Sequence, residues 1–115
     1  MAENEDVLVS VENGAGLITL NRPQAINSLT HPMVNAMSKV LTGWEHDDDI
    51  HAAVLSGAGE RGLCAGGDIV EVYNSARAGG GDAAKFWYDE YLLNAHIARY
   101  PKPYVALMDG IVMGG

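Results

Sequence analysis

Several residue types and patterns are scarce in this chain, and each scarcity excludes a class of protein. Cys64 is the single cysteine among 115 residues, which excludes an internal disulfide and fits a reducing compartment. The sequence has seven lysines and arginines and fifteen acidic residues, so no basic stripe is available to bind the phosphates of nucleic acid. No apolar run approaches the roughly 18 residues that a membrane span needs. The acidic start, Met1–Asp6, is typical of neither a signal peptide nor a transit peptide. These features predict a cytoplasmic protein that binds neither nucleic acid nor membrane.

The chain also lacks a recognisable metal site or catalytic thiol. None of its histidines has a ligand spacing such as i, i+4 on a helix: His31, His46, His51 and His96. We therefore predict no metal. Cys64 has apolar neighbours and no histidine close in sequence, so we interpret it as a small packed thiol rather than a nucleophile.

Strand and helix patterns alternate along the sequence, of which 48% is hydrophobic. We expect a strand at 7–12, a turn at 13–16, a return strand at 17–20, a helix capped by Thr30 with an apolar face (Met33, Met37, Val40, Leu41, Trp44), a strand at 52–55, helices at 69–76 and 82–99, and a strand at 104–108. A turn at Asp109–Gly110 follows, and residues 111–113 lead to the last two glycines. Pro101 and Pro103 end the second of these two helices. No linker divides the chain, so the pattern predicts a single α/β domain.

The most distinctive stretch is Arg61–Ile69, which follows the expected strand at 52–55. Its small residues, Ala65 to Gly67, would let a ligand contact the main chain directly. Asp68 is a candidate N-cap for a helix that begins at Ile69, which would set the loop amides at the positive end of a helix dipole. The loop is therefore predicted to present N–H donors to a negatively charged oxygen.

A second glycine pattern, Gly57–Gly62, fits the G-x-G-x-x-G spacing of dinucleotide-binding loops. That site requires the third glycine in the first turn of a helix, followed about 20 residues on by an acidic residue after a strand. Gly62 is followed by no amphipathic helix, and Asp82 follows three glycines rather than a strand. We interpret this stretch as a surface loop.

Glu90 and the last glycines are the remaining candidates for chemistry. Glu90 lies within the apolar stripe formed by Phe86, Leu93 and Ile97, so it either reaches water at the edge of the stripe or faces a pocket with a raised pKa. Gly115 ends a second stretch of bare backbone. Two such stretches, each supplying one N–H, are what an oxyanion hole for an acyl group requires.

Four motifs together resemble the crotonase (enoyl-CoA hydratase/isomerase) superfamily, occur in the family's order and cover nearly the whole chain: residues 21–29 (NRPQAINSL), 63–69 (LCAGGDI), 102–107 (KPYVAL) and 110–115 (GIVMGG). Residues 88–94 (YDEYLLN) and 102–107 are most similar to the 3-hydroxyisobutyryl-CoA hydrolase branch. The resemblance implies a crotonase-like ββα spiral. Because relatives are more than twice as long, residues 1–115 would be the N-terminal part of a single acyl-CoA-binding domain whose C-terminal part is absent.

The resemblance also implies roles for individual residues. Gly67 and Gly115 match the two positions whose backbone N–H groups form the family's oxyanion hole, and Glu90 matches a substrate-contacting glutamate of the hydrolase branch. The segments that hold the CoA adenine, ribose and pantetheine correspond to Gln24, Ala25, Ser28, Ala65, Asp68 and Ile69. Gln24 stands where relatives often have lysine, which implies a weaker contact with the CoA phosphates.

The implied activity is hydrolysis of a 3-hydroxyisobutyryl-CoA-like thioester, which in that branch belongs to valine breakdown. The alternatives are an enoyl-CoA hydratase/isomerase of the same superfamily and a truncated, non-catalytic homologue. Coenzyme A would enter as part of the substrate, with no permanently bound cofactor. The general acid/base would lie beyond Gly115, so the segment alone is expected to bind acyl-CoA weakly and to turn nothing over. The full-length protein is expected to be a homo-oligomer.

Overall fold

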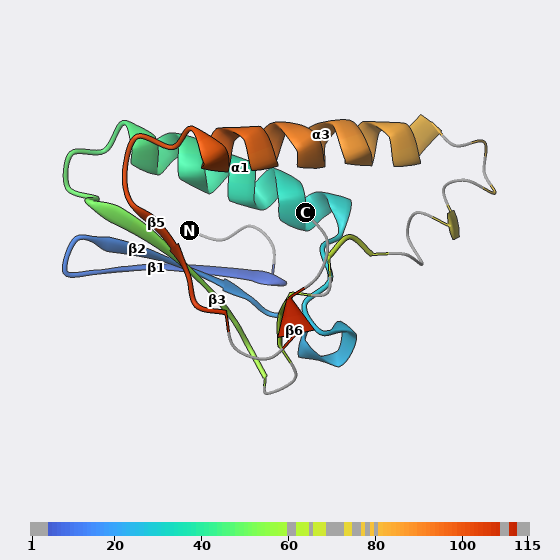
Figure 1. The fold of residues 1–115 in the computed structure, drawn as a ribbon, viewed down its shortest axis with the longest axis horizontal. Coiled ribbons are helices and arrows are strands. Elements are labelled where there is room, and N and C mark those ends of the chain that lie inside the picture. Colours follow the sequence, from blue (N-terminus) through green and yellow to red (C-terminus); the bar gives the residue numbers. More distant parts are fainter. Residues whose placement is uncertain are drawn as a thin grey trace.

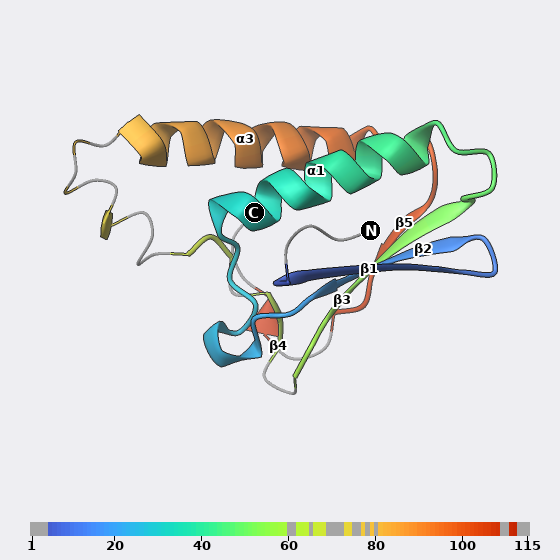
Figure 2. The ribbon, with the colours of Figure 1, turned by 180° about the vertical axis from the view of Figure 1, so that it is seen from behind.

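The computed structural model describes residues 5–59, 62–64, 66–68, 73–74, 77, 79, 81–108 and 111–112. A four-stranded sheet has the order β1-β2-β3-β5, and its members are β1 (Val7–Glu12), β2 (Ala15–Leu20), β3 (Ala52–Gly57) and β5 (Tyr104–Ala106). The first pair is antiparallel, and the other two pairs are parallel. Strands β4 (Gly62–Cys64), labelled in Figure 2, and β6 (Ile111–Val112), labelled in Figure 1, form a separate parallel pair. The expected mixed α/β architecture is confirmed.

A two-residue turn joins β1 to β2. Asn13 and Gly14 have φ values of 52° and 82°, and Glu12 pairs with Ala15, which is the geometry of a type I′ hairpin. Strand β2 therefore begins two residues before the expected Leu17. The sequence pattern missed Ala15 and Gly16 because small side chains carry little apolar signal. Only glycine fits at position 16 without a rearrangement, because a Cβ there would lie 2.5 Å from the Trp44 ring.

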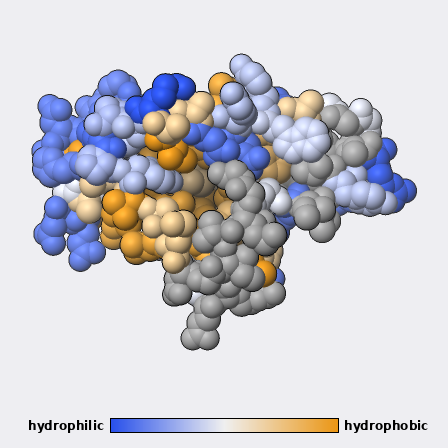
Figure 3. Space-filling model, viewed as in Figure 1, coloured by the Kyte–Doolittle hydropathy of each residue, from blue (hydrophilic) through white to orange (hydrophobic). Residues whose placement is uncertain are grey.

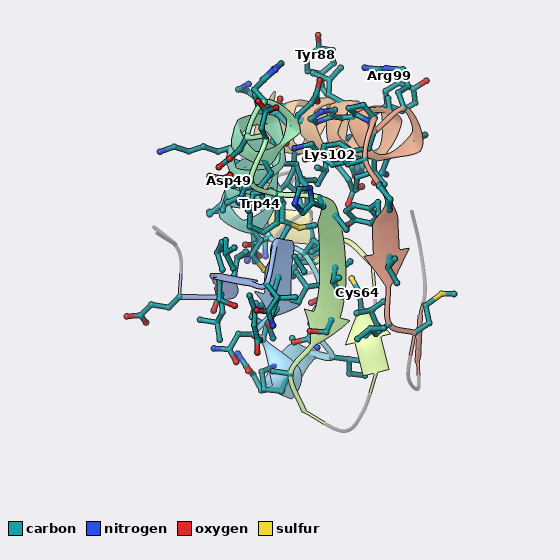
Figure 4. All side chains as sticks on the ribbon, turned by 90° about the vertical axis from the view of Figure 1, so that its left-hand side faces the viewer. Trp44, Asp49, Cys64, Tyr88, Arg99 and Lys102 are labelled. Atoms are coloured by element: carbon teal, nitrogen blue, oxygen red, sulfur yellow. The ribbon has the colours of Figure 1, made fainter. Side chains whose placement is uncertain are left out.

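Two helices, α1 (His31–Glu45) and α3 (Gly81–Ala98), cover one face of the sheet (Figures 1 and 2). The predicted cap is confirmed, because the Thr30 hydroxyl accepts a hydrogen bond from the Met33 N–H at 3.4 Å. The buried core between helices and sheet comprises Val7, Ile18, Leu20, Met33, Val34, Met37, Leu41, Trp44, Ile50, Ala53, Phe86 and Leu93. Trp44 lies between α1 and the strands (Figure 4).

Side-chain contacts join the two ends of α1 to the middle and the C-terminal end of α3. His31 Nε2 and Asp89 Oδ2 are 2.7 Å apart, and His96 Nε2 and Glu45 Oε1 are 2.5 Å apart. The hydrogen bond with His31 lowers the pKa of Asp89, and the one with His96 lowers the pKa of Glu45. The Tyr100 hydroxyl adds a hydrogen bond to the Leu41 carbonyl at 2.7 Å. The position of α3 over the sheet is therefore fixed through α1.

Several expectations need adjustment at element boundaries. Strand β5 ends at Ala106 rather than at 108, and Met108 is 73% exposed, although the Leu107 N–H still donates to the Leu55 carbonyl.

Gly62 begins strand β4, not a helix, which agrees with rejecting a dinucleotide loop. The expected helix at 69–76 falls mostly outside the described residues. Neither α1 nor α3 in the described part is long and apolar enough to cross a membrane.

Candidate active site

The loop between β2 and α1 is fixed by one buried asparagine. A 3-10 turn, η1 (Pro23–Ala25), contains the predicted CoA-contacting residues Gln24 and Ala25. The fully buried Asn27 accepts a hydrogen bond from the Arg22 N–H at 2.8 Å. Its side-chain amide donates to the carbonyls of Ala58 and Gly62, at 3.0 and 3.2 Å. Asn27 thereby holds this loop against the connection between β3 and β4.

Arg22 joins the same loop to the glycine loop. Its Nη1 atom lies 2.8 Å from the Asp68 carboxylate and also donates to the Ser28 carbonyl at 2.8 Å and the Ser28 hydroxyl at 3.1 Å. The side chains of Arg22 and Asp68 are only 19% and 11% exposed. Asp68 was predicted to cap a helix beginning at Ile69, a residue outside the described part. What the structure shows is that the Asp68 carboxylate pairs with arginine.

The main chain at Gly67 is held between two hydrogen bonds. The Leu29 N–H donates to the Gly66 carbonyl and the Asp68 N–H donates to the Leu29 carbonyl, both at 2.7 Å, in a parallel bridge between Leu29 and Gly67. Both bonds use the neighbours of Gly67, and within the described part of the chain its own N–H has no hydrogen-bond partner. The bridge therefore fixes the backbone at Gly67, and none of the described residues accepts a hydrogen bond from its N–H.

Glu90 lies beside this amide. A Cβ built on Gly67 would be 3.5 Å from Glu90 Oε2 and 3.8 Å from Phe86 Cζ. Burial raises the pKa of the Glu90 carboxyl, and among the described residues its side chain has no hydrogen-bond partner. Of the two interpretations of Glu90, the structure shows the pocket-facing one. Its contact with a substrate stays a prediction.

A cavity of about 300 Å³ lies between α3 and the sheet and contains Glu90 in its wall. The side chains around it are mostly apolar: Leu20, Leu29, Met37, Leu55, Leu63, Leu93, Ile97, Ala98, Ala106 and Met108, together with Cys64, Asn94, Tyr104 and the backbone of Gly66. Figure 3 shows the apolar surface that continues along β5 below α3, where Val105, Leu107 and Met108 are exposed. A cavity of this size and polarity suits a small acyl group.

Cys64 borders the cavity, but its environment disfavours a nucleophilic role. Burial raises the pKa of the thiol, and the nearby Glu90 carboxylate raises it further. A catalytic thiolate needs the opposite shift. The sulfur instead accepts a hydrogen bond from the Gly66 N–H at 3.3 Å. No group of three or more metal-ligating side chains is present within the ranges that the structure describes.

The structure brings some of the predicted site residues together. Gly67 and Glu90 lie side by side, and Arg22 links Ser28 to Asp68. Ala65, Ile69 and Gly115 lie outside the described residues, so the convergence of two glycine amides stays a prediction. Sequence reasoning missed Arg22 and Asn94. The signal for Asn94 was its position four residues after Glu90, on the same face of a helix.

Comparison with known proteins identifies the family. The enoyl-CoA hydratase/isomerase family model matches residues 15–115. Among curated relatives, 3-hydroxyisobutyryl-CoA hydrolase of Danio rerio is 44% identical over 110 residues, which are 96% of this chain and 29% of that protein.

Solved structures give the same result. A carnitinyl-CoA dehydratase from Mycobacterium thermoresistibile is 68% identical with a TM-score of 0.94, over 96% of this chain and 33% of that one. An enoyl-CoA hydratase from Rhodobacter sphaeroides is 43% identical with a TM-score of 0.88, over 92% and 32%. The chain thus spans about a third of the length of its relatives, which is consistent with an N-terminal portion of the fold. It belongs to the enoyl-CoA hydratase/isomerase family of the crotonase superfamily.

Proposed function

We propose that this chain is the acyl-thioester-binding part of an enzyme that hydrolyses a 3-hydroxyisobutyryl-CoA-like substrate. One observation carries the proposal: the N–H of Gly67, which has no hydrogen-bond partner among the described residues, lies near Glu90, and Glu90 lines a small apolar cavity. The names of the curated relatives support a CoA-thioester hydrolase. Coenzyme A is then part of the substrate, and the proposal needs no further cofactor.

In the proposed reaction, the thioester carbonyl oxygen accepts a hydrogen bond from the Gly67 N–H. Negative charge grows on this oxygen in the tetrahedral intermediate, so the bond is stronger in the transition state than in the ground state. One such donor contributes about 10²–10³ to kcat in comparable oxyanion holes. Gly115 is proposed as the second donor. The proposed CoA contacts are Gln24, Ala25, Ser28, Ala65, Asp68 and Ile69.

Direct binding to this chain tests the proposal. We expect weak, saturable binding of butyryl-CoA by calorimetry and no turnover. Gly67→Ala should weaken binding about tenfold or more, because the added methyl would lie 3.5 Å from Glu90 Oε2 and compete with the acyl group for the space beside that carboxyl. Gly43→Ala is the matched control, since a Cβ at Gly43 meets nothing within 4 Å. Unchanged binding by Gly67→Ala would contradict the proposed oxyanion site.

A hydratase or isomerase is the second candidate, because the two solved structures named above carry hydratase and dehydratase names. The complete reading frame that includes these residues should be offered 3-hydroxyisobutyryl-CoA and crotonyl-CoA in parallel. Release of free thiol from the first identifies a hydrolase, whereas loss of the conjugated double bond of the second identifies a hydratase. Absence of both reactions would favour a non-catalytic homologue.

The names of the curated relatives place them in mitochondria, so a cytoplasmic location remains a prediction to be tested by fractionation.

A further inference from the structure

Helix α3 has an unusual distribution of polar and aromatic residues. Its outer face carries Trp87, Tyr88 and Tyr91, which are 56%, 62% and 72% exposed. Its inner face carries two polar residues, Glu90 and Asn94, which line the cavity together with apolar side chains. The rest of this inner face is apolar, as expected for a surface helix, with Phe86 and Leu93 each 2% exposed. The polar residues on the inner face therefore need an explanation.

Glu90 and Asn94 are one helical turn apart, so their Cβ atoms are about 5–6 Å from each other on the same side of α3. Among the described residues neither side chain has a hydrogen-bond partner. Both side chains are half-buried at the cavity wall, where a bound ligand can supply hydrogen bonds. A carboxyl group and an amide that both face one small cavity can together bind a hydroxyl group, because the carboxyl accepts its proton and the amide N–H donates to its oxygen.

The order of the groups along α3 fits an acyl chain, because Gly67 lies near Phe86 and Glu90, and Asn94 is one turn farther on. Gly67, which would bind the thioester carbonyl, is beside Glu90, and Asn94 is about 6 Å farther along the helix axis. Two carbon–carbon bonds, one carbon–oxygen bond and one hydrogen bond, at tetrahedral angles, span roughly the same 6 Å. We propose that Asn94 is a specificity-determining residue that, with Glu90, binds a hydroxyl group near the β-carbon of the acyl chain. This inference rests on the proposed function, since it needs the thioester carbonyl at Gly67.

The test compares 3-hydroxybutyryl-CoA with butyryl-CoA, which differ by one hydroxyl group, in calorimetric binding to this chain. We expect the hydroxylated thioester to bind about tenfold more tightly, as two modest hydrogen bonds in a partly solvated site predict. Asn94→Leu has a similar volume and no amide but keeps Glu90, so it should reduce this preference to about threefold. Ile97→Val is the matched control, because it alters the apolar wall of the same cavity and should weaken both ligands while keeping their ratio.

Each outcome has a defined meaning. Equal affinity of the unmodified chain for the two thioesters, or a tenfold preference retained in folded Asn94→Leu, would overturn the role of Asn94 and leave the proposed function standing. Failure of both thioesters to bind would overturn the two proposals together. If circular dichroism shows that Asn94→Leu does not fold, the affinity ratio of the unmodified chain decides.

Discussion

The contact between Arg22 and Asp68 provides the sharpest stability prediction. A single nitrogen, Nη1, binds the Asp68 carboxylate, the Ser28 carbonyl and the Ser28 hydroxyl at 2.8, 2.8 and 3.1 Å. Both charged side chains are largely buried, with exposures of 19% and 11%. Arg22→Met keeps much of the aliphatic stem and removes the charge. The substitution removes the arginine that pairs with the poorly solvated Asp68 carboxylate.

Breaking a buried ion pair from one side costs about 3–5 kcal/mol, and partial exposure of this pair lowers the expected loss to about 2–4 kcal/mol. A chain of this size should then melt roughly 10 °C lower. Asp68→Asn in the Arg22→Met background removes the carboxylate charge, so the double variant should lose about 1–3 kcal/mol less than the sum of the single losses.

Urea denaturation followed by circular dichroism measures all four proteins of this cycle. Arg22→Lys should be intermediate, because one ammonium can replace a single-nitrogen contact but is more strongly hydrated. Strictly additive losses in the cycle would refute the reasoning, since they would mean that Arg22 and Asp68 stabilise the fold independently.

Three further predictions follow from the same contacts. Gly16→Ala should lose about 1–3 kcal/mol, because its Cβ would overlap the Trp44 ring at 2.5 Å, whereas Gly67→Ala should stay within about 1 kcal/mol of the parent protein in the same denaturation assay. Glu90→Gln should melt higher than the parent at neutral pH. Because the pKa of Glu90 is raised in the folded state, the parent protein loses stability as the pH rises from the ordinary glutamate pKa through the folded pKa. The difference in Tm between the variant and the parent should therefore vanish below the ordinary glutamate pKa. A difference in Tm that does not change with pH would contradict this prediction. Tyr104→Phe should be neutral or slightly stabilising on heating, because the buried Tyr104 hydroxyl has no hydrogen-bond partner among the described residues and burial raises its pKa to about 12. A loss above about 1 kcal/mol would mean that the hydroxyl makes a stabilising contact.

Local sequence patterns were sufficient for most of the fold. The Thr30 cap and the apolar spacing that follows it gave α1, and the Asn13–Gly14 turn gave the β1–β2 hairpin. The stripe on α3 was also correct, since Phe86 and Leu93 are each 2% exposed. These features depend on neighbours within one or two turns of chain, which is the range over which period and capping carry information.

The site depends on contacts that no local pattern encodes. Arg22 and Asp68 are far apart in sequence and meet only because Asn27 and the Leu29–Gly67 bridge bring their loops together. Within its own loop, Asp68 had the pattern of a helix cap, and the charge of its distant partner could not be read from that pattern. The placement of Glu90 against Gly67 likewise requires the packing of α3 on α1, which is set by tertiary contacts.

The placement of the two tryptophans gives the protein a built-in pair of optical reporters. Trp44 is 8% exposed against Gly16 in the core, whereas Trp87 is 56% exposed on the outer face of α3. Acrylamide should therefore quench the emission of Trp87 in the native protein and reach Trp44 only after the core opens. Because Trp87 faces away from the cavity, replacing it with phenylalanine should leave a chain whose remaining fluorescence follows unfolding alone.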